Sequence, residues 1–158
     1  MKTCVFAGTF DPITNGHTFV IDKCLEIFDK VIIAVGVNVD KSPTFCLEDR
    51  VKMIKAVYSD SDKVVVKTFE GMLTNFMKEN EISVNVRGIR DVDDYKYETT
   101  MARYNQDMYP EITTLYIPTP ANLTYVSSSA VRNIINLKSD ISAYVPKPVT
   151  DIINKIIK

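Results

Sequence analysis

The sequence has few of the residues that stabilise small secreted domains or bind metals. Its 158 residues include no tryptophan, one histidine and three cysteines. Cys4, Cys24 and Cys46 are odd in number, widely spaced and without a Cys-x-x-Cys pair, which argues against a disulfide framework or a zinc site. We therefore expect all three to be buried as small apolar residues.

Long apolar runs are lacking as well. The first apolar stretch, residues 3–7, ends at a glycine and is too short for the core of a signal peptide. No run approaches the ~20 residues that a membrane-spanning helix needs. These absences predict a cytoplasmic protein with no membrane partner.

Neither sign of charge is in excess. Lysine and arginine total 19 against 20 aspartates and glutamates, for a net charge of -1. This balance gives no general attraction to nucleic acid, so any affinity for phosphate must be local. The motifs GxxxxGK[ST] and GxGxxG are absent, which excludes a P-loop and a dinucleotide-binding fingerprint.

The pattern of the chain indicates an α/β fold in one domain, residues 1–158. Apolar β-branched runs alternate with stretches of helical periodicity, which is typical of a doubly wound, Rossmann-like parallel sheet with helices on both faces. We expect every strand to be covered on both sides, because each run is nearly uninterrupted. The predicted strands are 3–7, 31–37, 64–69, 83–86 and 113–117, and the predicted helices are 17–29, 47–58, 72–80, 92–108, 128–136 and 147–158.

Four polar segments follow predicted strands. In open parallel sheets, ligands bind at the carboxyl ends of the strands, so segments placed there are candidates for one shared site. The segments are 8–17, 38–41, 87–90 and 122–129.

The single histidine, His17, lies where the first helix is expected to begin, one residue after Gly16. A helix start offers unpaired N–H groups and a positive dipole end to an anion. A histidine at this position can also be a simple cap or surface residue. In either protonation state the ring can donate a hydrogen bond.

Two arginines and a run of serines have similar alternatives. Arg87 and Arg90 flank Gly88; they can be solvated charges or a bidentate phosphate site. Ser127, Ser128 and Ser129 can cap a helix while binding phosphate oxygens.

Two other groups favour a structural interpretation. The acidic residues at 91, 93 and 94 open a helix and complement its dipole, so we assign them no metal. The stripe of Tyr95, Tyr97, Met101 and Tyr104 fits packing or an oligomer contact better than a binding role.

Four motifs in order resemble those of one family. Gly8-Thr9-Phe10-Asp11-Pro12 followed by Thr14-x-Gly16-His17 is similar to the signature of the HxGH-type nucleotidyltransferase superfamily, in its bacterial phosphopantetheine adenylyltransferase branch. The segments 38–41 and 87–90, and Ser127 to Ser129 followed by Arg132, fit the same branch. Threonine at position 14, where the superfamily has histidine, is usual for this branch. The resemblance spans nearly the whole chain.

The resemblance implies a strand order of 3-2-1-4-5 and an activity, transfer of AMP from ATP to 4'-phosphopantetheine, giving dephospho-coenzyme A and pyrophosphate. It implies catalytic roles for His17, Lys41 and Arg90, and an acceptor site of Thr9, Lys41, Leu73 and Arg87. The residues that it implies for ATP are Thr9, Phe10, His17, Gly88, Ile89, Arg90, Glu98, Leu123, Thr124, Tyr125, Val126, Ser127, Ser128 and Ser129.

The resemblance also implies Mg²⁺ accompanying ATP, and a homohexamer. Three other functions remain open. Another transferase of the superfamily would act on nicotinate mononucleotide or use CTP. A sensor would bind the nucleotide without turnover, and a synthetase fragment would act on RNA, although the chain carries no basic stripe.

Overall fold

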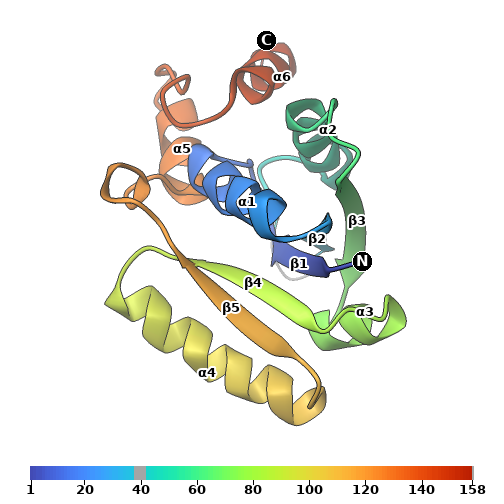
Figure 1. The fold of residues 1–158 in the computed structure, drawn as a ribbon. Coiled ribbons are helices and arrows are strands. Elements are labelled where there is room, and N and C mark those ends of the chain that lie inside the picture. Colours follow the sequence, from blue (N-terminus) through green and yellow to red (C-terminus); the bar gives the residue numbers. More distant parts are fainter. Residues whose placement is uncertain (38–41, 158) are drawn as a thin grey trace.

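The computed structural model describes residues 1–37 and 42–157. Its strands form one parallel five-stranded sheet in the order β3-β2-β1-β4-β5. Helices cover both faces (Figure 1). This confirms the predicted Rossmann-like α/β fold and the strand order that the resemblance implies. The elements are β1 Thr3–Gly8, α1 Asn15–Ile27, β2 Lys30–Val37, α2 Leu47–Val57, β3 Val64–Glu70, α3 Leu73–Glu79, β4 Val84–Ile89, α4 Val92–Met108, β5 Thr113–Pro118, the 3-10 helix η1 Ala121–Leu123, α5 Ser128–Asn136 and α6 Lys147–Ile156.

The central strand β1 contributes alternate side chains to two hydrophobic cores. Cys4 and Phe6 pack with α1, α2, α5 and α6 on one face. Val5 and Ala7 pack with α3 and the residues that follow α4 on the other face. This alternation is the two-residue period of a strand, and it explains why an uninterrupted apolar run is buried on both sides.

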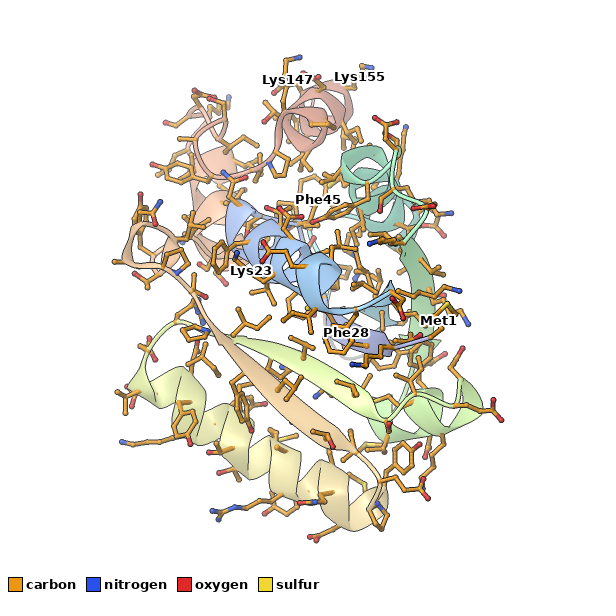
Figure 2. The ribbon with its side chains drawn as sticks, in the orientation of Figure 1. Met1, Lys23, Phe28, Phe45, Lys147 and Lys155 are labelled. Atoms are coloured by element: carbon orange, nitrogen blue, oxygen red, sulfur yellow. The ribbon has the colours of Figure 1, made fainter. Side chains whose placement is uncertain are left out.

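Side chains fill the space between α1, α2 and the sheet. In Figure 2, Phe28 and Phe45 point into the interior, whereas Lys147 and Lys155 on α6 point outward. Phe28 is 8% exposed and Phe45 2%. The loops at this end of the sheet therefore start from a packed hydrophobic core.

The edge strands differ from the prediction that every strand is covered on both faces. Residues of β3 and β5 are partly exposed or exposed along their length, whereas β1 and β2 are almost entirely buried. Edge position explains the difference, because the helices cover the centre of the sheet more completely than its margins.

Several boundaries also differ. The helix α1 begins at Asn15, two residues before the predicted start, so His17 lies inside its first turn. The strand β4 runs to Ile89, so Arg87 and Gly88 belong to the strand, whereas the prediction placed them after it.

One cysteine prediction is wrong. Cys4 and Cys24 are buried, as expected, but Cys46 is exposed. It precedes α2, and its thiol donates a hydrogen bond to Asp49 Oδ2 at 3.1 Å. The residue acts locally as a polar group at a helix start.

Candidate active site

A cavity of about 520 Å³ lies at the carboxyl end of the sheet. It opens beside β1, which has β2 on one side and β4 on the other. The connection after β1 leads to one side of the sheet, and later strands are added on the other, so this is the point at which ligands bind in open α/β sheets. Residues of three predicted segments, 8–17, 87–90 and 122–129, contribute to its wall, and the fourth segment, 38–41, lies outside the described residues.

Thr14 fixes the orientation of the His17 ring. The backbone N–H of Thr14 donates to His17 Nδ1 at 3.0 Å, and Thr14 Oγ1 lies 3.1 Å from the same nitrogen. Because Nδ1 accepts the backbone proton, the neutral ring carries its own proton on Nε2. The ring also packs edge-on against Phe10, with centroids 5.1 Å apart. His17 therefore lines the cavity as a fixed hydrogen-bond donor.

The surroundings of His17 keep it uncharged. Burial, with the positive charges of Arg87 and Arg90, lowers the pKa of His17 to about 4. At neutral pH the His17 ring is therefore neutral. A phosphate placed beside it would favour the charged form and raise the pKa.

Arg87 is held by an acidic partner from α4. Its Nε and Nη2 donate to Glu98 at 2.9 and 2.6 Å, and its Nη1 donates to the backbone oxygen of Ala7 at 2.6 Å. Both side chains are largely buried. This bidentate pair fixes the guanidinium plane, and N–H groups of Nη1 and Nη2 that these bonds do not use remain for a ligand.

Arg90 also pairs with an acidic side chain, that of Asp94, four residues later in the first turn of α4. Its Nε donates to Asp94 Oδ2 at 2.7 Å and its Nη2 to Oδ1 at 3.0 Å. The hydrogen bond from Arg90 lowers the pKa of Asp94. Asp91 caps α4 by accepting from the Asp94 N–H at 2.8 Å, as expected for acids at a helix start. Asp94 therefore does more than complement the helix dipole: it orients Arg90.

The three serines at the start of α5 have distinct partners. Ser127 caps the helix by accepting from the Ala130 N–H at 3.1 Å. Ser128 donates to the backbone oxygen of Pro12 at 2.8 Å, and Ser129 accepts from Arg132 Nη2 at 3.1 Å. The N-termini of α1 and α5 thus face one cavity, and each offers a positive dipole end to an anion.

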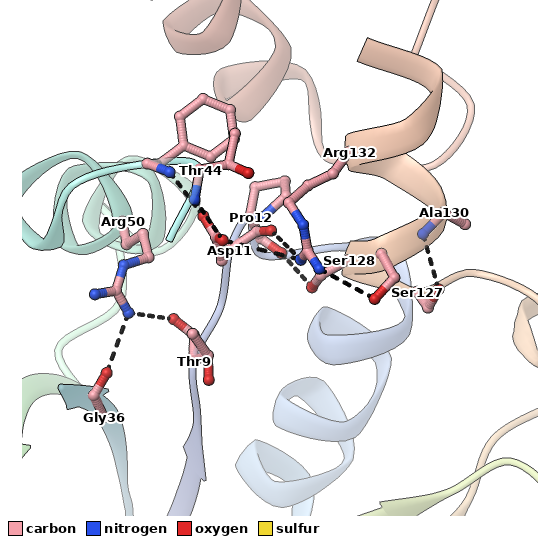
Figure 3. Close-up of polar contacts among 12 residues, drawn as sticks. Thr9, Asp11, Pro12, Gly36, Thr44, Arg50, Ser127, Ser128, Ala130 and Arg132 are labelled. Atoms are coloured by element: carbon pink, nitrogen blue, oxygen red, sulfur yellow. Dashed lines mark hydrogen bonds and ion pairs between the residues drawn. The ribbon is translucent and has the colours of Figure 1, made fainter. Parts of the chain in front are cut away.

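Asp11 is a buried carboxylate that joins three segments (Figure 3). It is 5% exposed, and its two oxygens accept from the N–H groups of Thr44 and Phe45, both at 2.9 Å. Arg132 donates to its backbone oxygen at 2.8 Å and lies 3.9 Å from its carboxylate. The β1–α1 loop is thereby fixed to the approach to α2 and to α5.

Gly88 is required for packing as well as for access to the cavity. A Cβ built on Gly88 would lie 2.8 Å from Val20 Cγ2, closer than real contacts allow. The absence of a side chain lets α1 pack directly on β4.

Most of the predicted site residues line the cavity, and some do not. Those that line it are Thr9, Phe10, His17, Arg87, Gly88, Arg90, Glu98, Leu123, Val126, Ser127, Ser128 and Ser129. Leu73, Ile89, Thr124 and Tyr125 do not. Leu73 begins α3 and packs against the second core, whereas Tyr125 is 67% exposed. Lys41 lies outside the described residues.

The sequence pattern missed Arg50. It occupies a charged position in an amphipathic helix, which predicts a solvated side chain, yet it is 3% exposed and lines the cavity. Asp11 stood inside a recognised motif, but its partners at 44 and 45 had no sequence signal.

The described residues contain no cluster of three or more histidine, cysteine or acidic side chains that could hold a metal. Asp94 and Glu98 are already paired with arginines. A divalent cation at this site would therefore have to be held mainly by ligand phosphates and water.

Comparison with known proteins agrees with the geometry. The family model described as cytidylyltransferase-like matches residues 5–134. The phosphopantetheine adenylyltransferase of Clostridium novyi is 41% identical over 157 residues, covering 99% of this chain and 98% of that protein. The enzyme of the same name from Chromobacterium violaceum is 42% identical over 153 residues, covering 94% and 93%.

Solved structures share the fold at lower identity. One from Vibrio parahaemolyticus superposes with a TM-score of 0.73 at 20% identity, over 98% of this chain and 93% of that one. The nicotinic acid mononucleotide adenylyltransferase of Plasmodium falciparum gives 0.68 at 19% identity, over 98% and 95%. The fold is thus shared more widely than the sequence. On both the family match and the full-length relatives, the chain belongs to the cytidylyltransferase-like family and, within it, to the phosphopantetheine adenylyltransferases.

Proposed function

We propose that this chain transfers AMP from ATP to 4'-phosphopantetheine, producing dephospho-coenzyme A and pyrophosphate in coenzyme A biosynthesis. The observation that carries the proposal is the cavity in which His17, Arg87, Arg90 and the N-terminus of α5 meet. The full-length relatives named phosphopantetheine adenylyltransferase support the choice of acceptor.

The chemistry suits a site without a nucleophilic side chain. An oxygen of the acceptor phosphate forms a bond with the α-phosphorus of ATP, and the bond from that phosphorus to the β-phosphate oxygen breaks. The nucleophile is already an anion, so no strong general base is needed. Catalysis reduces to alignment of the two phosphates and neutralisation of charge.

In this proposal His17 stabilises the charge that develops at the α-phosphate. Its Nδ1 is occupied by the Thr14 N–H, so Nε2 is the donor that remains for a ligand. A donor fixed before the reaction avoids the cost of reorganisation in the transition state.

The acceptor phosphate would be bound by Arg87 and Thr9, with Lys41 also assigned to it. Arg87 is oriented by Glu98 and lines the same wall as Thr9. Leu73 would contact the pantetheine arm, although it does not line the cavity.

ATP would lie along the other side of the cavity. Arg90 and the N-terminus of α5 would bind its phosphates, and Phe10, Gly88 and Leu123 would surround the nucleoside. Ile89, Glu98 and residues 124–126 complete the proposed contacts. Mg²⁺ would enter with ATP as part of the substrate.

We also propose a homohexamer located in the cytoplasm. Exposed apolar side chains on α4 and β5 support an assembly contact; they are Val92, Tyr95, Tyr97, Tyr104, Met108 and Leu115. No helix in the described part of the chain is long and apolar enough to cross a membrane. Light scattering coupled to size-exclusion chromatography measures the number of subunits directly.

The decisive experiment measures pyrophosphate release from ATP and Mg²⁺ with either 4'-phosphopantetheine or nicotinate mononucleotide as acceptor. We expect release with phosphopantetheine, and loss of at least ~100-fold in kcat for His17→Ala, the usual cost of removing a transition-state donor. Lys55→Ala, on the exposed side of α2, is the matched control.

Two other outcomes would reject the proposal. Release with nicotinate mononucleotide would keep the superfamily and change the acceptor. Tight binding of ATP without release from either acceptor would identify a nucleotide sensor.

A further inference from the structure

Arg50 is a buried arginine that belongs to α2 but contacts the ends of two strands. It is 3% exposed, and its Nη1 donates to the backbone oxygens of Thr9 at 2.7 Å and Gly36 at 3.1 Å (Figure 3). Arginine is rarely buried so completely in a protein interior. Its position therefore needs an explanation that ordinary helix packing does not give.

The contacts fall at the level where the sheet opens. The pairing of β1 with β2 ends at Gly8 and Val35; the next residues along the chain are Thr9, which follows β1, and Gly36, which is still in β2. There the strand β2 continues alongside β3, with Gly36 opposite Phe69. The Arg50 guanidinium thus bridges β1 and β2 one residue beyond their last backbone pair.

The Thr9 contact bears directly on the site. The Thr9 oxygen belongs to the peptide group that leads into Phe10, whose φ of 52° is in the left-handed region that non-glycine residues avoid. Such a conformation persists only where the surroundings fix it. Phe10 is 1% exposed, and its ring packs edge-on against His17.

We propose that Arg50 is a positioning residue of the active site: by holding the oxygens of Thr9 and Gly36 together, it fixes the turn that places Thr9 and Phe10 against the reacting phosphates and His17. The inference rests on the proposed function for its kinetic consequence. Its structural consequence, the placement of the turn, does not.

A second set of hydrogen bonds joins the same two segments, with the side chain on the turn and the backbone groups on the approach to α2. Asp11, in the turn, accepts from the N–H groups of Thr44 and Phe45, which lead into the helix that carries Arg50. Each segment therefore supplies one buried side chain to the backbone of the other. Removal of Arg50 leaves the Asp11 contacts in place, so the expected defect is a displaced turn in a folded protein.

The test compares Arg50→Met and Arg50→Lys below their unfolding temperatures. We expect Arg50→Met to lower kcat by roughly 10- to 100-fold, the size of effect that a displacement of about 1 Å produces. The KM for ATP should rise by a smaller factor than kcat falls, because the Arg50 hydrogen bonds reach the turn at Thr9 and Phe10 but not α5 or Arg90, which would bind the ATP phosphates. Arg50→Lys keeps a charged donor and should recover part of kcat.

The NMR signal of the single histidine gives a readout that does not require turnover. Movement of the Phe10 ring against His17 should change the ring carbon and proton shifts of His17 in Arg50→Met, and less in Arg50→Lys. Lys52→Met, on the same helix but exposed, and Ile153→Val, a core change in α6, are the controls that should leave both kcat and the shifts unaltered.

Wild-type kcat with unchanged His17 shifts in Arg50→Met would overturn the inference. If Arg50→Met does not fold, Arg50→Gln replaces it, and wild-type values there would overturn it equally. If the native protein releases no pyrophosphate, the proposed function fails, and the His17 shifts alone decide the role of Arg50.

Discussion

The backbone N–H of Thr14 donates to His17 Nδ1 over 3.0 Å, so the residue that precedes α1 sets which nitrogen of the only imidazole carries the proton. One hydrogen bond thus serves both the start of the helix and the site. His17 accepts from the Thr14 N–H, which has no partner within the helix, and at the same time presents Nε2 as a donor to the cavity.

His17 should titrate far below the usual range for histidine. Its pKa of about 4 predicts that the NMR signal of the single imidazole shifts with a midpoint near pH 4 in the free protein. At pH 7 the ring should be neutral. Binding of a phosphate ligand should raise this pKa. A free-protein midpoint near the ordinary value of 6.5 would contradict the buried, arginine-flanked environment.

The same shift predicts how stability depends on pH. As pH falls, the unfolded chain takes up the His17 proton near its ordinary value of 6.5, whereas the folded chain takes it up only near 4. The contribution of this group to the free energy of unfolding is complete above pH 6.5, declines between 6.5 and 4, and then levels off. Urea denaturation at a series of pH values measures this dependence. In His17→Asn the free energy of unfolding should fall less steeply between pH 6.5 and 4.

Neutralising Glu98 should loosen Arg87. In Glu98→Gln the bidentate ion pair becomes a weaker contact, while the bond from Arg87 to the Ala7 oxygen remains. We expect the KM for the acceptor to rise by roughly 10-fold, equivalent to about 1.4 kcal/mol. Steady-state kinetics with saturating ATP measures it, with Glu26→Gln, an exposed acid on α1, as the control. An unchanged KM would show that Glu98 does not orient Arg87 for binding.

Replacing Asp11 with asparagine should destabilise the whole chain. The amide has one oxygen for the two N–H groups of Thr44 and Phe45, and its NH₂ group would face the other donor. We expect a loss of about 1–3 kcal/mol in the free energy of unfolding. Urea denaturation compares Asp11→Asn with Asp151→Asn, a change at a largely exposed carboxylate. Equal stability of the two variants would show that the hydrogen bonds of Asp11 to Thr44 and Phe45 do not stabilise the fold.

Adding a methyl group at Gly88 should push α1 away from β4. The new Cβ would lie 2.8 Å from Val20 Cγ2, and overpacking of this kind costs about 1–3 kcal/mol. Val20→Ala removes the opposing methyl groups, so the double variant should regain part of the stability lost in Gly88→Ala. Thermal unfolding measures both, and additive losses would place the clash elsewhere.

The sequence predicted the sheet and its helices because those depend on local periodicity, and it predicted that segments following different strands meet at one edge because that depends on where strands end. His17 and the serines at 127–129 were identifiable because each lies at the start of a helix. Arg50 was not, since a charge on an amphipathic helix normally faces solvent, and only the packing of α2 against the strand ends buries it. Cys46 was misassigned for the converse reason: a residue type that is usually buried lies at an exposed helix start.

Partial exposure of β3 and β5 depends on strand order, and strand order is not a local property. The pairing of Arg90 with Asp94 was within reach of the sequence, because the two residues are one helical turn apart. The pairing of Arg87 with Glu98 required the observed approach of α4 to β4, which no spacing encodes.

Arg87, Arg90 and Arg132 each lie beside a carboxylate of the chain itself. From a distance, much of their field is therefore cancelled, and a passing polyanion meets little attraction. The site therefore discriminates between anions by short-range hydrogen bonds, because N–H groups in fixed positions bind only a phosphate of suitable shape. A chain that is nearly neutral overall can in this way handle highly charged substrates without being drawn to every nucleic acid around it.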